Sequence, residues 1–480
     1  MKSYIRFLMH ASQQQPALST VDWRRFRSTI RGRVIFPDDS MFDAARRVYN
    51  GAIDRRPAVI VRCAGAADVI ASVGAARAYD IPLAIRGGGH SLHGFGVCDR
   101  GLVVDLSDLR GIQVDTKRLI ATAQGGATWR DVDYETQAFG LATTGAHISS
   151  VGIGGMTLGG GCGWLMRRHG LAIDNLLSAD VVTADGQFIT ASEDEHADLF
   201  WALRGGGGNF GVVTSFQFRL HRLDCPIIGG TLFYPASRTL DLLQCFRDMI
   251  QKAGDDLSAL FAVLIGPVAA FLPPELHNVP VVAITVCHLG GPCDADTDLA
   301  PLRRLQPVLD RVAPMPYRRL QRLFDAAGVF GRRAESRAGH LTELSDDAMH
   351  TWAHHSSMVP GTDSIAMLSA LGGAVGRVDE MKTAFSYRST AFDFAANARW
   401  SAEHDTTQHT EWTMAFGRAM RPFVTGCYVN EASERGQDEG PAYTPQTYHR
   451  LVSIKNSYDP DNVFRLNYNI APSVRALPRD

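Results

Sequence analysis

The sequence predicts an α+β fold with more than one domain, and three observations lead to this prediction. The chain has 480 residues, which is more than one hydrophobic core usually serves. Short β-branched runs alternate with stretches of helical periodicity in the N-terminal half. Glycine is abundant, with 46 residues, and it gathers in three short stretches. Clustered glycines expose backbone N–H groups, so the sequence also indicates a cofactor-binding fold.

The composition excludes several classes of protein. Hydrophobic residues make up 45% and charged residues 20%, which is ordinary for a soluble globular protein. The net charge of -2 gives no electrostatic reason to expect a nucleic-acid or membrane-surface partner. The eight cysteines form no C-x-x-C pair, so neither a disulfide scaffold nor a metal site is predicted. We expect no transmembrane helix and no signal peptide, and cytoplasmic residence is therefore the default expectation.

The first elements form a compact unit that leads into the first glycine stretch. A strand, a helix and a second strand follow one another at short spacing, which is typical of a β-α-β unit. The predicted elements are helices at Val21–Arg33, Ala44–Tyr49 and Ala66–Tyr79, and strands at Ala58–Val61, Ile81–Ile85 and Leu102–Leu106.

The first glycine stretch is Ile85–Gly96, with the sequence IRGGGHSLHGFG. It connects two strands and opens no helix, which excludes a Walker-type phosphate loop. His90 stands directly after the glycine triplet, where exposed backbone would surround a ligand. An ordinary loop histidine bonded to backbone is the alternative. A metal pair with His93 is disfavoured because zinc needs three or four ligands and none is near in sequence.

The second glycine stretch, Val151–Leu165, follows a predicted hairpin at Ile112–Ala123 and a helix at Thr128–Ala138. Apolar residues alternate with its glycines, and no polar residues dilute them. This pattern argues against a flexible linker. It favours backbone packed directly against a flat ligand, with glycine wherever a Cβ atom would collide.

The third glycine stretch is Arg204–Val213. A hairpin at Val181–Thr190, turning at Ala184-Asp185-Gly186, precedes it. The stretch contains G-x-G-x-x-G, but a Rossmann fingerprint must follow a strand and open a helix. Here a helix, His196–Leu203, comes first and a strand, Val212–Phe218, comes after, so a nicotinamide site is excluded.

The central part of the chain indicates a separate unit. Strands are predicted at Leu260–Ile265 and Val281–Val286, and helices at Thr239–Gln251 and Pro301–Leu309. This mixture is typical of an antiparallel sheet with covering helices, inserted between two parts of the cofactor domain.

Together these motifs resemble the vanillyl-alcohol oxidase superfamily, and in particular its berberine-bridge-enzyme-like and 6-hydroxynicotine-oxidase-like flavoproteins. The resemblance rests on the three glycine stretches in order and on a closing segment, Tyr458–Ile470, that is similar to the family's Asp-Pro-x-Asn-x-Phe motif. It implies a two-part FAD-binding domain of the PCMH type with an inserted antiparallel-sheet substrate domain. The boundaries we predict are 1–224 and 431–480 for the FAD-binding domain and 225–430 for the substrate domain.

The resemblance also implies how FAD is held. His90 matches the histidine that carries the flavin covalently through its 8α carbon. Many relatives add a cysteine link, but Ile148 stands at that position here, so a single link is predicted. A second bond from Cys162 is the alternative, and a buried structural thiol is its ordinary interpretation. The predicted cofactor-binding residues are Arg86, Gly87, Gly88, Gly89, His90, Ser91, Ser150, Gly152, Gly155, Gly159, Gly161, Val213 and Asn467.

Three residues are candidates for the proton acceptor, because many relatives place a tyrosine directly after Tyr-x-Asn and this chain has Tyr428-Val429-Asn430-Glu431. Glu431 could replace the tyrosine, since burial raises a carboxylate pKa toward neutrality. A solvated surface glutamate is the alternative. Tyr468, on the closing strand, and Tyr428 are the other candidates. We expect Tyr428 to lie on the strand face opposite Glu431, because side chains alternate along a strand.

The function predicted from these motifs is that of an FAD-dependent oxidoreductase. As an oxidase, it would take a hydride from a small alcohol, amine or secondary-metabolite substrate and pass the electrons to O2, giving H2O2. A flavin dehydrogenase with another acceptor is the near alternative. A flavin-containing protein that binds a small molecule, or confers resistance to it, without turnover is the alternative from a different class.

Overall fold

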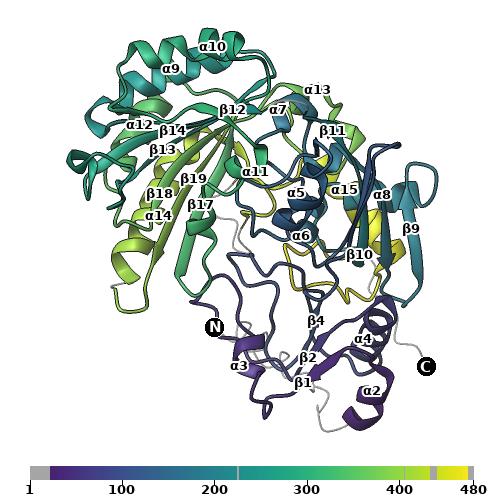
Figure 1. Ribbon diagram of the computed structural model, residues 1–480. Coiled ribbons are helices and arrows are strands. Elements are labelled where there is room, and N and C mark those ends of the chain that lie inside the picture. Colours follow the sequence, from purple (N-terminus) through teal and green to yellow (C-terminus); the bar gives the residue numbers. More distant parts are fainter. Residues whose placement is uncertain (1–21, 224–225, 405, 433–439, 474–480) are drawn as a thin grey trace.

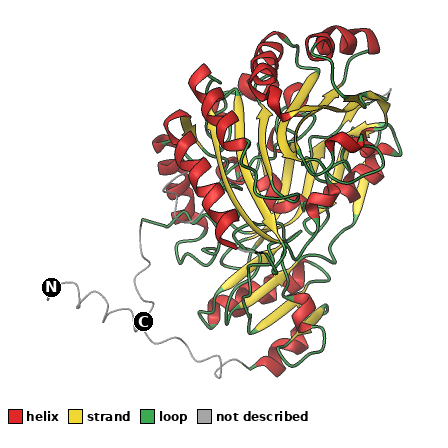
Figure 2. Ribbon diagram, turned by 90° about the vertical axis from the view of Figure 1, so that its left-hand side faces the viewer, coloured by secondary structure: helices red, strands yellow, loops and turns green. Residues whose placement is uncertain are grey.

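The computed structural model describes residues 22–223, 226–404, 406–432 and 440–473 (Figure 1). Within these residues the strands form four sheets, one with parallel pairs and three that are antiparallel. The predicted α+β character is confirmed. Figure 2 shows the long strands of the largest sheet in the upper part of the molecule and the small parallel sheet at its lower end.

The first sheet delivers the first glycine stretch. Its central pairs are parallel, with β2 and β3 on either side of β4, while β1 is antiparallel to β2. Helix α4 crosses between β2 and β3, so the predicted β-α-β unit is confirmed. The elements are β1 (Arg33–Ile35), β2 (Val59–Arg62), β4 (Leu102–Asp105), β3 (Leu83–Arg86), α2 (Trp23–Thr29), α3 (Phe42–Ala45) and α4 (Ala66–Ala78).

The second sheet is antiparallel and carries the other two glycine stretches at its margins. Its order is β5-β6-β10-β8-β9, and both predicted hairpins are present. The strands are β5 (Ile112–Asp115), β6 (Ile120–Gln124), β10 (Val212–Arg219), β8 (Leu176–Val182) and β9 (Phe188–Ser192), beside the two-stranded pair β7 (Leu141–Ala142) and β11 (His221–Arg222). The helices are α5 (Trp129–Gln137), α6 (Ile153–Leu158), α7 (Met166–His169) and α8 (Ala197–Leu203).

Local sequence explains why one of these helices was predicted and another was not. Helix α5 begins after Thr128, where the Asp131 carboxylate accepts hydrogen bonds from the Thr128 backbone N–H and hydroxyl, both at 2.8 Å. Helix α6 lies inside the second glycine stretch and was not predicted, because its Gly154 and Gly155 weaken the helical signal.

The largest sheet in the described residues has nine strands, and every pair in it is antiparallel. Its strands are β15 (Leu309–Asp310), β12 (Ile227–Pro235), β14 (Pro280–His288), β13 (Leu257–Ile265), β18 (Ile365–Ala370), β19 (Phe392–Trp400), β17 (Arg333–Leu341) and β20 (Val424–Gly426), with β16 (Ala313–Met315) beside β12. The helices of this part are α9 (Thr239–Lys252), α10 (Pro292–Arg304), α11 (Tyr317–Leu320), α12 (Asp346–Ser356), α13 (Ala374–Arg377) and α14 (Thr406–Met420).

The two faces of this sheet differ. Helices α9, α12 and α14 cover one face, seen at the left and top of Figure 1, and a core that includes Phe246, Trp352 and Phe416 fills the space between. We call the other face the inner face, and it looks toward the glycine stretches. Because side chains alternate along a strand, Phe394 enters the helix-covered core while its neighbour Ala395 lies on the inner face.

Three predicted elements are wrong in position or type. The helix expected at Ala44–Tyr49 is α3, which begins at Phe42 and already ends at Ala45. The helix expected at Pro301–Leu309 is α10, which begins with Pro292 at its first turn and already ends at Arg304. The closing segment was expected to be a strand, yet after α15 (Pro445–Tyr458) the described chain is irregular through residue 473.

Buried side chains hold the closing segment in place of strand partners. The Asp459 carboxylate accepts hydrogen bonds from the backbone N–H groups of Val463 at 2.7 Å and Phe464 at 2.9 Å. The buried Lys455 ammonium donates to the carbonyl oxygens of Asn209 at 2.8 Å and Phe464 at 3.0 Å. These bonds satisfy backbone groups that a sheet would otherwise pair.

The predicted domain boundaries remain predictions, although the nine-stranded sheet spans residues 227–426. No helix among the described residues is both long enough and apolar enough to cross a membrane. The same residues contain no cluster of three or more His, Cys, Asp or Glu side chains that could hold a metal ion.

Candidate active site

A cavity of about 490 Å³ lies between the glycine stretches and the inner face of the nine-stranded sheet. This volume is in the range of small-molecule and cofactor sites, about 300–1,000 Å³. One wall is built from backbone of all three glycine stretches, and the opposite wall from side chains of β13, β18 and β19. The arrangement can hold a flat molecule against backbone and expose it to groups on the sheet.

The first two glycine stretches touch through their backbones. A Cβ atom added to Gly88 would lie 2.4 Å from the backbone nitrogen of Gly152, and one added to Gly152 would lie 2.3 Å from that of Gly88. Both positions therefore require glycine. At Gly155, which lines the cavity, an added Cβ would meet no protein atom within 4 Å, so only a ligand could crowd it.

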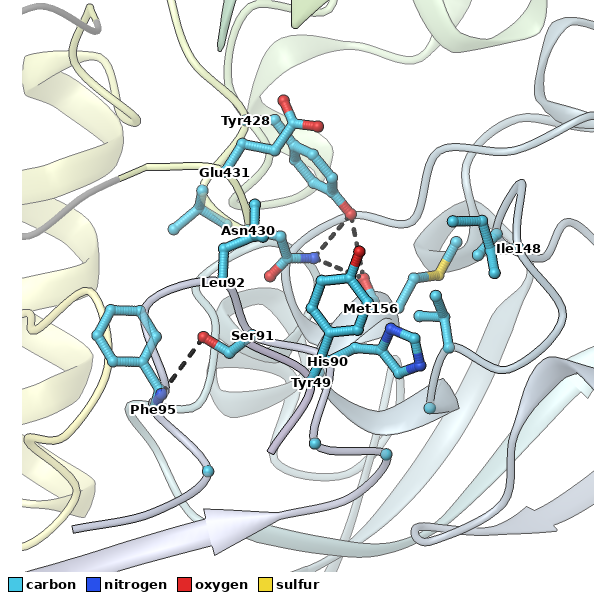
Figure 3. A pocket seen from close by; sticks show the side chains of 18 of the residues that line it. Tyr49, His90, Ser91, Leu92, Phe95, Ile148, Met156, Tyr428, Asn430 and Glu431 are labelled. Atoms are coloured by element: carbon cyan, nitrogen blue, oxygen red, sulfur yellow. Dashed lines mark hydrogen bonds between the residues drawn. The ribbon is translucent and has the colours of Figure 1, made fainter. Parts of the chain in front are cut away.

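His90 lines the cavity beside this crossing, and Figure 3 shows it with its neighbours. Burial lowers the pKa of its imidazole to about 4, and a backbone hydrogen bond at Ser150 offsets only part of this shift. The ring is therefore neutral at physiological pH. Its Nε2 atom is buried and has no hydrogen-bond partner among the residues that the structure describes.

Other buried polar atoms at this wall also lack partners within the described chain, namely Arg86 Nη1 and Asn467 Oδ1. Arg86 is held by Asp105, whose Oδ2 lies 2.7 Å from Arg86 Nη2. Burial pushes the Asp105 pKa up, but the Arg86 charge and hydrogen bond pull it below its usual value. Buried polar atoms are normally satisfied, so these groups fit a ligand rich in hydrogen-bonding atoms, as FAD is.

The third glycine stretch and the closing segment form one corner of the cavity. Gly207, Gly208 and Asn209 line it. The Asn467 amide donates to the Gly208 carbonyl oxygen at 3.1 Å, and the Asn209 amide donates to that of Tyr468 at 3.1 Å. These bonds place both predicted residues of the closing segment on the cavity wall.

Tyr428 and Glu431 lie in a turn and not on a strand, so the alternation expected for them is wrong. The turn closes through a 2.8 Å bond from the Glu431 backbone N–H to the Tyr428 carbonyl. The Tyr428 hydroxyl accepts from Gly161 N at 2.9 Å and Asn430 Nδ2 at 2.8 Å, and it donates to Met156 O at 3.3 Å (Figure 3). Burial raises the Tyr428 pKa well above its usual value. All of its hydrogen-bonding capacity is used, so it positions the turn.

Glu431 is half-buried and lines the cavity, and its carboxylate points away from His90 in Figure 3. It is therefore not a fully solvated surface residue. Residues 433–439 of the charged segment that follows it lie outside the described part of the chain.

The inner face of the sheet supplies polar residues that the sequence analysis missed. Asp393, Asn397 and Arg399 of β19 line the cavity, and His340 Nδ1 lies 2.9 Å from Asp393 Oδ1. A signal was present in the sequence, because Asp393, Asn397 and Arg399 share one face of the strand and only Ala395 interrupts them. A polar face on a strand whose other face is apolar indicates contact with solvent or with a cavity.

Cys162 also lines the cavity. Burial, followed by the nearby charges of Asp393 and Glu431, raises the pKa of its thiol well above the usual value. A thiol that stays protonated is a poor nucleophile. The surroundings of Cys162 thus favour the structural interpretation over a second flavin bond.

The structure brings most of the predicted site residues together. The cavity is lined by Arg86, Gly87, Gly88, Gly89, His90, Ser91, Gly152, Gly155, Asn467, Tyr428, Glu431 and Tyr468. Ser150, Gly159, Gly161 and Val213 are not on its wall. An added Cβ at Gly159 would collide with Asn430, and Gly161 bonds Tyr428, so these two glycines support the turn.

Comparison with known proteins agrees with this geometry. Residues 57–192 match the family described as FAD binding domain, and residues 427–471 match that described as berberine and berberine like. The chain is 34% identical to (R)-6-hydroxynicotine oxidase of Paenarthrobacter nicotinovorans over 461 residues, covering 92% of this chain and 97% of the relative. It is 38% identical to the FAD-linked oxidoreductase pgmH of Aspergillus terreus over 506 residues, covering 97% and 99%.

Solved structures show the same fold. 6-Hydroxy-D-nicotine oxidase from Arthrobacter nicotinovorans matches with a TM-score of 0.83 and 30% identity, over 92% of this chain and 98% of that one. A berberine bridge enzyme variant in complex with (S)-reticuline matches in fold, with a TM-score of 0.82 at 20% identity, over 94% and 98%. The predicted fold class and family are confirmed, and so is FAD as the cofactor, while its covalent attachment to His90 stays a prediction. The chain belongs to the berberine-bridge-like FAD-linked oxidoreductases, and it is an enzyme that binds FAD.

Proposed function

We propose that the protein is an oxidase that carries FAD covalently on His90, oxidises a small amine or alcohol and returns the electrons to O2. The observation that supports this most directly is the position of His90. A neutral imidazole, whose buried Nε2 has no hydrogen-bond partner among the described residues, faces a cavity walled by glycine backbone. Such a nitrogen is a competent nucleophile, whereas the Cys162 thiol in the same cavity is protonated.

FAD, when bound, supplies the acceptor for a hydride from the substrate. The glycine stretches would hold it through backbone contacts, and the inner face of the sheet would place the substrate against it. That face excludes water with apolar side chains, among them Leu260, Ile365 and Met367. The reaction also needs a group that takes a proton from the substrate's N–H or O–H.

The geometry narrows the choice of proton acceptor. Tyr428 is an unsuitable base because its hydroxyl is fully engaged in holding the turn. Glu431 and Tyr468 remain candidates on the cavity wall, and Asp393 joins them from the opposite wall. Of these, Asp393 lies on the sheet that would contact the substrate and has His340 beside it, so we propose Asp393 as the first residue to test.

The inner face suits a substrate with an apolar body and one basic or hydroxyl group. Its apolar residues surround a small set of polar ones, namely Asp393, Asn397 and Arg399 of β19, Ser369 of β18 and Glu335 of β17. The relative named 6-hydroxynicotine oxidase acts, by its name, on a small nitrogen heterocycle of this chemical type. We therefore propose amines and alcohols on small rings as the substrate class.

The flavin spectrum tests this function. Candidates, beginning with the two enantiomers of 6-hydroxynicotine, are added under nitrogen and then air is admitted. Bleaching followed by recovery in air, with H2O2 formed, supports the oxidase. Bleaching that persists in air until another acceptor is added supports a dehydrogenase instead.

The covalent link has its own test. Acid precipitation should leave yellow flavin on the wild-type pellet, and His90→Ala should release it into the supernatant. If the wild-type flavin is also released, the covalent link is wrong even if the oxidase activity is found.

A further inference from the structure

His90 lies in a part of the chain that gives its ring no local support. The three residues before it are glycines, and Gly89 has a φ of +68°, so no preceding side chain can pack against the imidazole. An unsupported imidazole would sample several rotamers. Whatever fixes its direction must come from elsewhere in the fold.

Two aromatic rings from distant segments enclose the imidazole. The Tyr49 ring stacks on it with ring centroids 5.0 Å apart and 20° between the planes, and Figure 3 shows the two rings side by side. The Phe330 ring meets it edge-on, at 5.3 Å and 89°. Phe330 also contacts Tyr49 edge-on at 5.9 Å, so the three rings form one cluster.

Tyr49 is itself fixed at several points. Its backbone N–H donates to the Gly89 carbonyl at 2.9 Å, and its carbonyl accepts from Gly331 N at 3.1 Å. Its hydroxyl donates to the Ala327 carbonyl at 2.8 Å. These bonds join the glycine loop to the segment that carries Phe330. The stacked ring therefore has little freedom.

We propose that Tyr49 and Phe330 form an aromatic clamp that aims Nε2 of His90 at the flavin and thereby sets the rate of covalent attachment. This inference rests on the covalent link proposed above. Both aromatic residues are positioning residues, since they act through His90. The Ser150 hydrogen bond leaves Nε2 as the nitrogen available for the bond, because Nε2 has no partner among the described residues.

The attachment chemistry shows why the direction of Nε2 affects the rate of covalent attachment. A bond forms between Nε2 and the 8α carbon of the flavin. One hydrogen leaves that carbon as a proton, a second proton leaves the other imidazole nitrogen, and two electrons pass through the flavin to O2, which becomes H2O2. Bond formation needs the nitrogen lone pair directed at the carbon at close range.

The test measures attachment and needs no substrate. Each purified variant is incubated with excess FAD in air, and samples taken over time are precipitated with acid. Flavin retained on the pellet is compared with total bound flavin, and intact mass confirms the adduct. We expect Tyr49→Leu and Phe330→Leu to attach flavin about 3- to 10-fold more slowly, the range that loss of one aromatic contact gives. Total bound flavin should stay within about twofold of wild type in Phe330→Leu, because Phe330 is not on the cavity wall, whereas Tyr49 is.

Matched controls separate an effect on the direction of the His90 imidazole from an effect on folding. Tyr49→Phe keeps the stacked ring and should attach at nearly the wild-type rate. Phe271→Leu removes an aromatic ring that is as exposed as Phe330, 45% against 44%, but lies in the β13–β14 hairpin, and it should have no effect. Phe330→Leu keeps the test decisive if Tyr49→Leu fails to fold, because Phe330 is a partly exposed residue.

The outcomes are distinct. Wild-type attachment rates in both leucine variants, or equal losses of attached and total flavin, would overturn the clamp. If wild-type flavin is released by acid as fully as that of His90→Ala, the covalent link itself is absent and the clamp falls with it.

Discussion

The glycines of the cavity wall can be tested by adding one methyl group at a time. Gly155 and Gly88 both line the cavity, but the protein surrounds them differently. A Cβ at Gly155 would meet no protein atom within 4 Å, whereas a Cβ at Gly88 would lie 2.4 Å from Gly152 N. If FAD packs on this backbone, Gly155→Ala should harm only flavin binding and Gly88→Ala should harm the fold as well.

The expected changes in stability and FAD affinity follow from what surrounds each glycine. Gly155 lies within α6, so alanine should stabilise the flavin-free protein by about 0.5–1 kcal/mol through helix propensity. Crowding of the bound flavin should cost about 1–3 kcal/mol, which lowers affinity about 5- to 150-fold. Gly88→Ala should destabilise the flavin-free protein by about 1–3 kcal/mol or more, because two backbones must separate.

The assay uses a His90→Ala background, in which flavin is exchangeable. Urea unfolding of the flavin-free proteins gives stability, and FAD titration gives affinity. Gly74→Ala is the matched control, because Gly74 lies within α4, also has no atom within 4 Å of an added Cβ, and is remote from the cavity. It should raise stability and leave FAD affinity unchanged. An unaltered FAD affinity in Gly155→Ala would refute the proposed packing of flavin on this wall.

Three further predictions concern titratable side chains. Burial raises the pKa of Asp133 to about 7, against 3.8 in the unfolded chain, although a hydrogen bond from Gln321 opposes the shift. The folded protein therefore favours the neutral acid, and its stability falls as the pH rises from about 4 to 7. Asp133→Asn removes this ionisation, so the unfolding free energy that the variant gains over wild type should grow by about 2–3 kcal/mol between pH 5 and 8. Urea titrations at the two pH values measure it. Lys455→Met should cost about 3–5 kcal/mol by the same assay, because it leaves a buried carboxylate 2.6 Å away without its partner; a loss below 1 kcal/mol would contradict this. With a substrate found, Asp393→Asn should slow anaerobic flavin reduction about 100-fold or more and Glu431→Gln much less, and the reverse order would make Glu431 the base.

The cofactor half of the site was predictable because its information is local. Glycines that meet another backbone, as at Gly88 and Gly152, leave a direct trace in the sequence. The β-α-β unit and the hairpins were predictable for the same reason, since spacing and turn residues specify them within a few positions. The closing segment was wrongly predicted to be a strand, because Lys455 and Asp459 satisfy its backbone groups through tertiary contacts that the sequence does not show.

The substrate half was harder because its residues have meaning only after the sheet is assembled. Asp393 becomes a site residue when β19 pairs with β17 and β18, which sets it opposite His340 and Ser369 and turns it to the inner face. Tyr49 faces His90 only because a loop before β2 meets the segment before β17. Both cases involve residues far apart in sequence and of ordinary type. We therefore expect substrate specificity to depend on such residues of the sheet. Substitutions at the polar residues of β19 should change which substrate is oxidised and leave flavin binding unchanged.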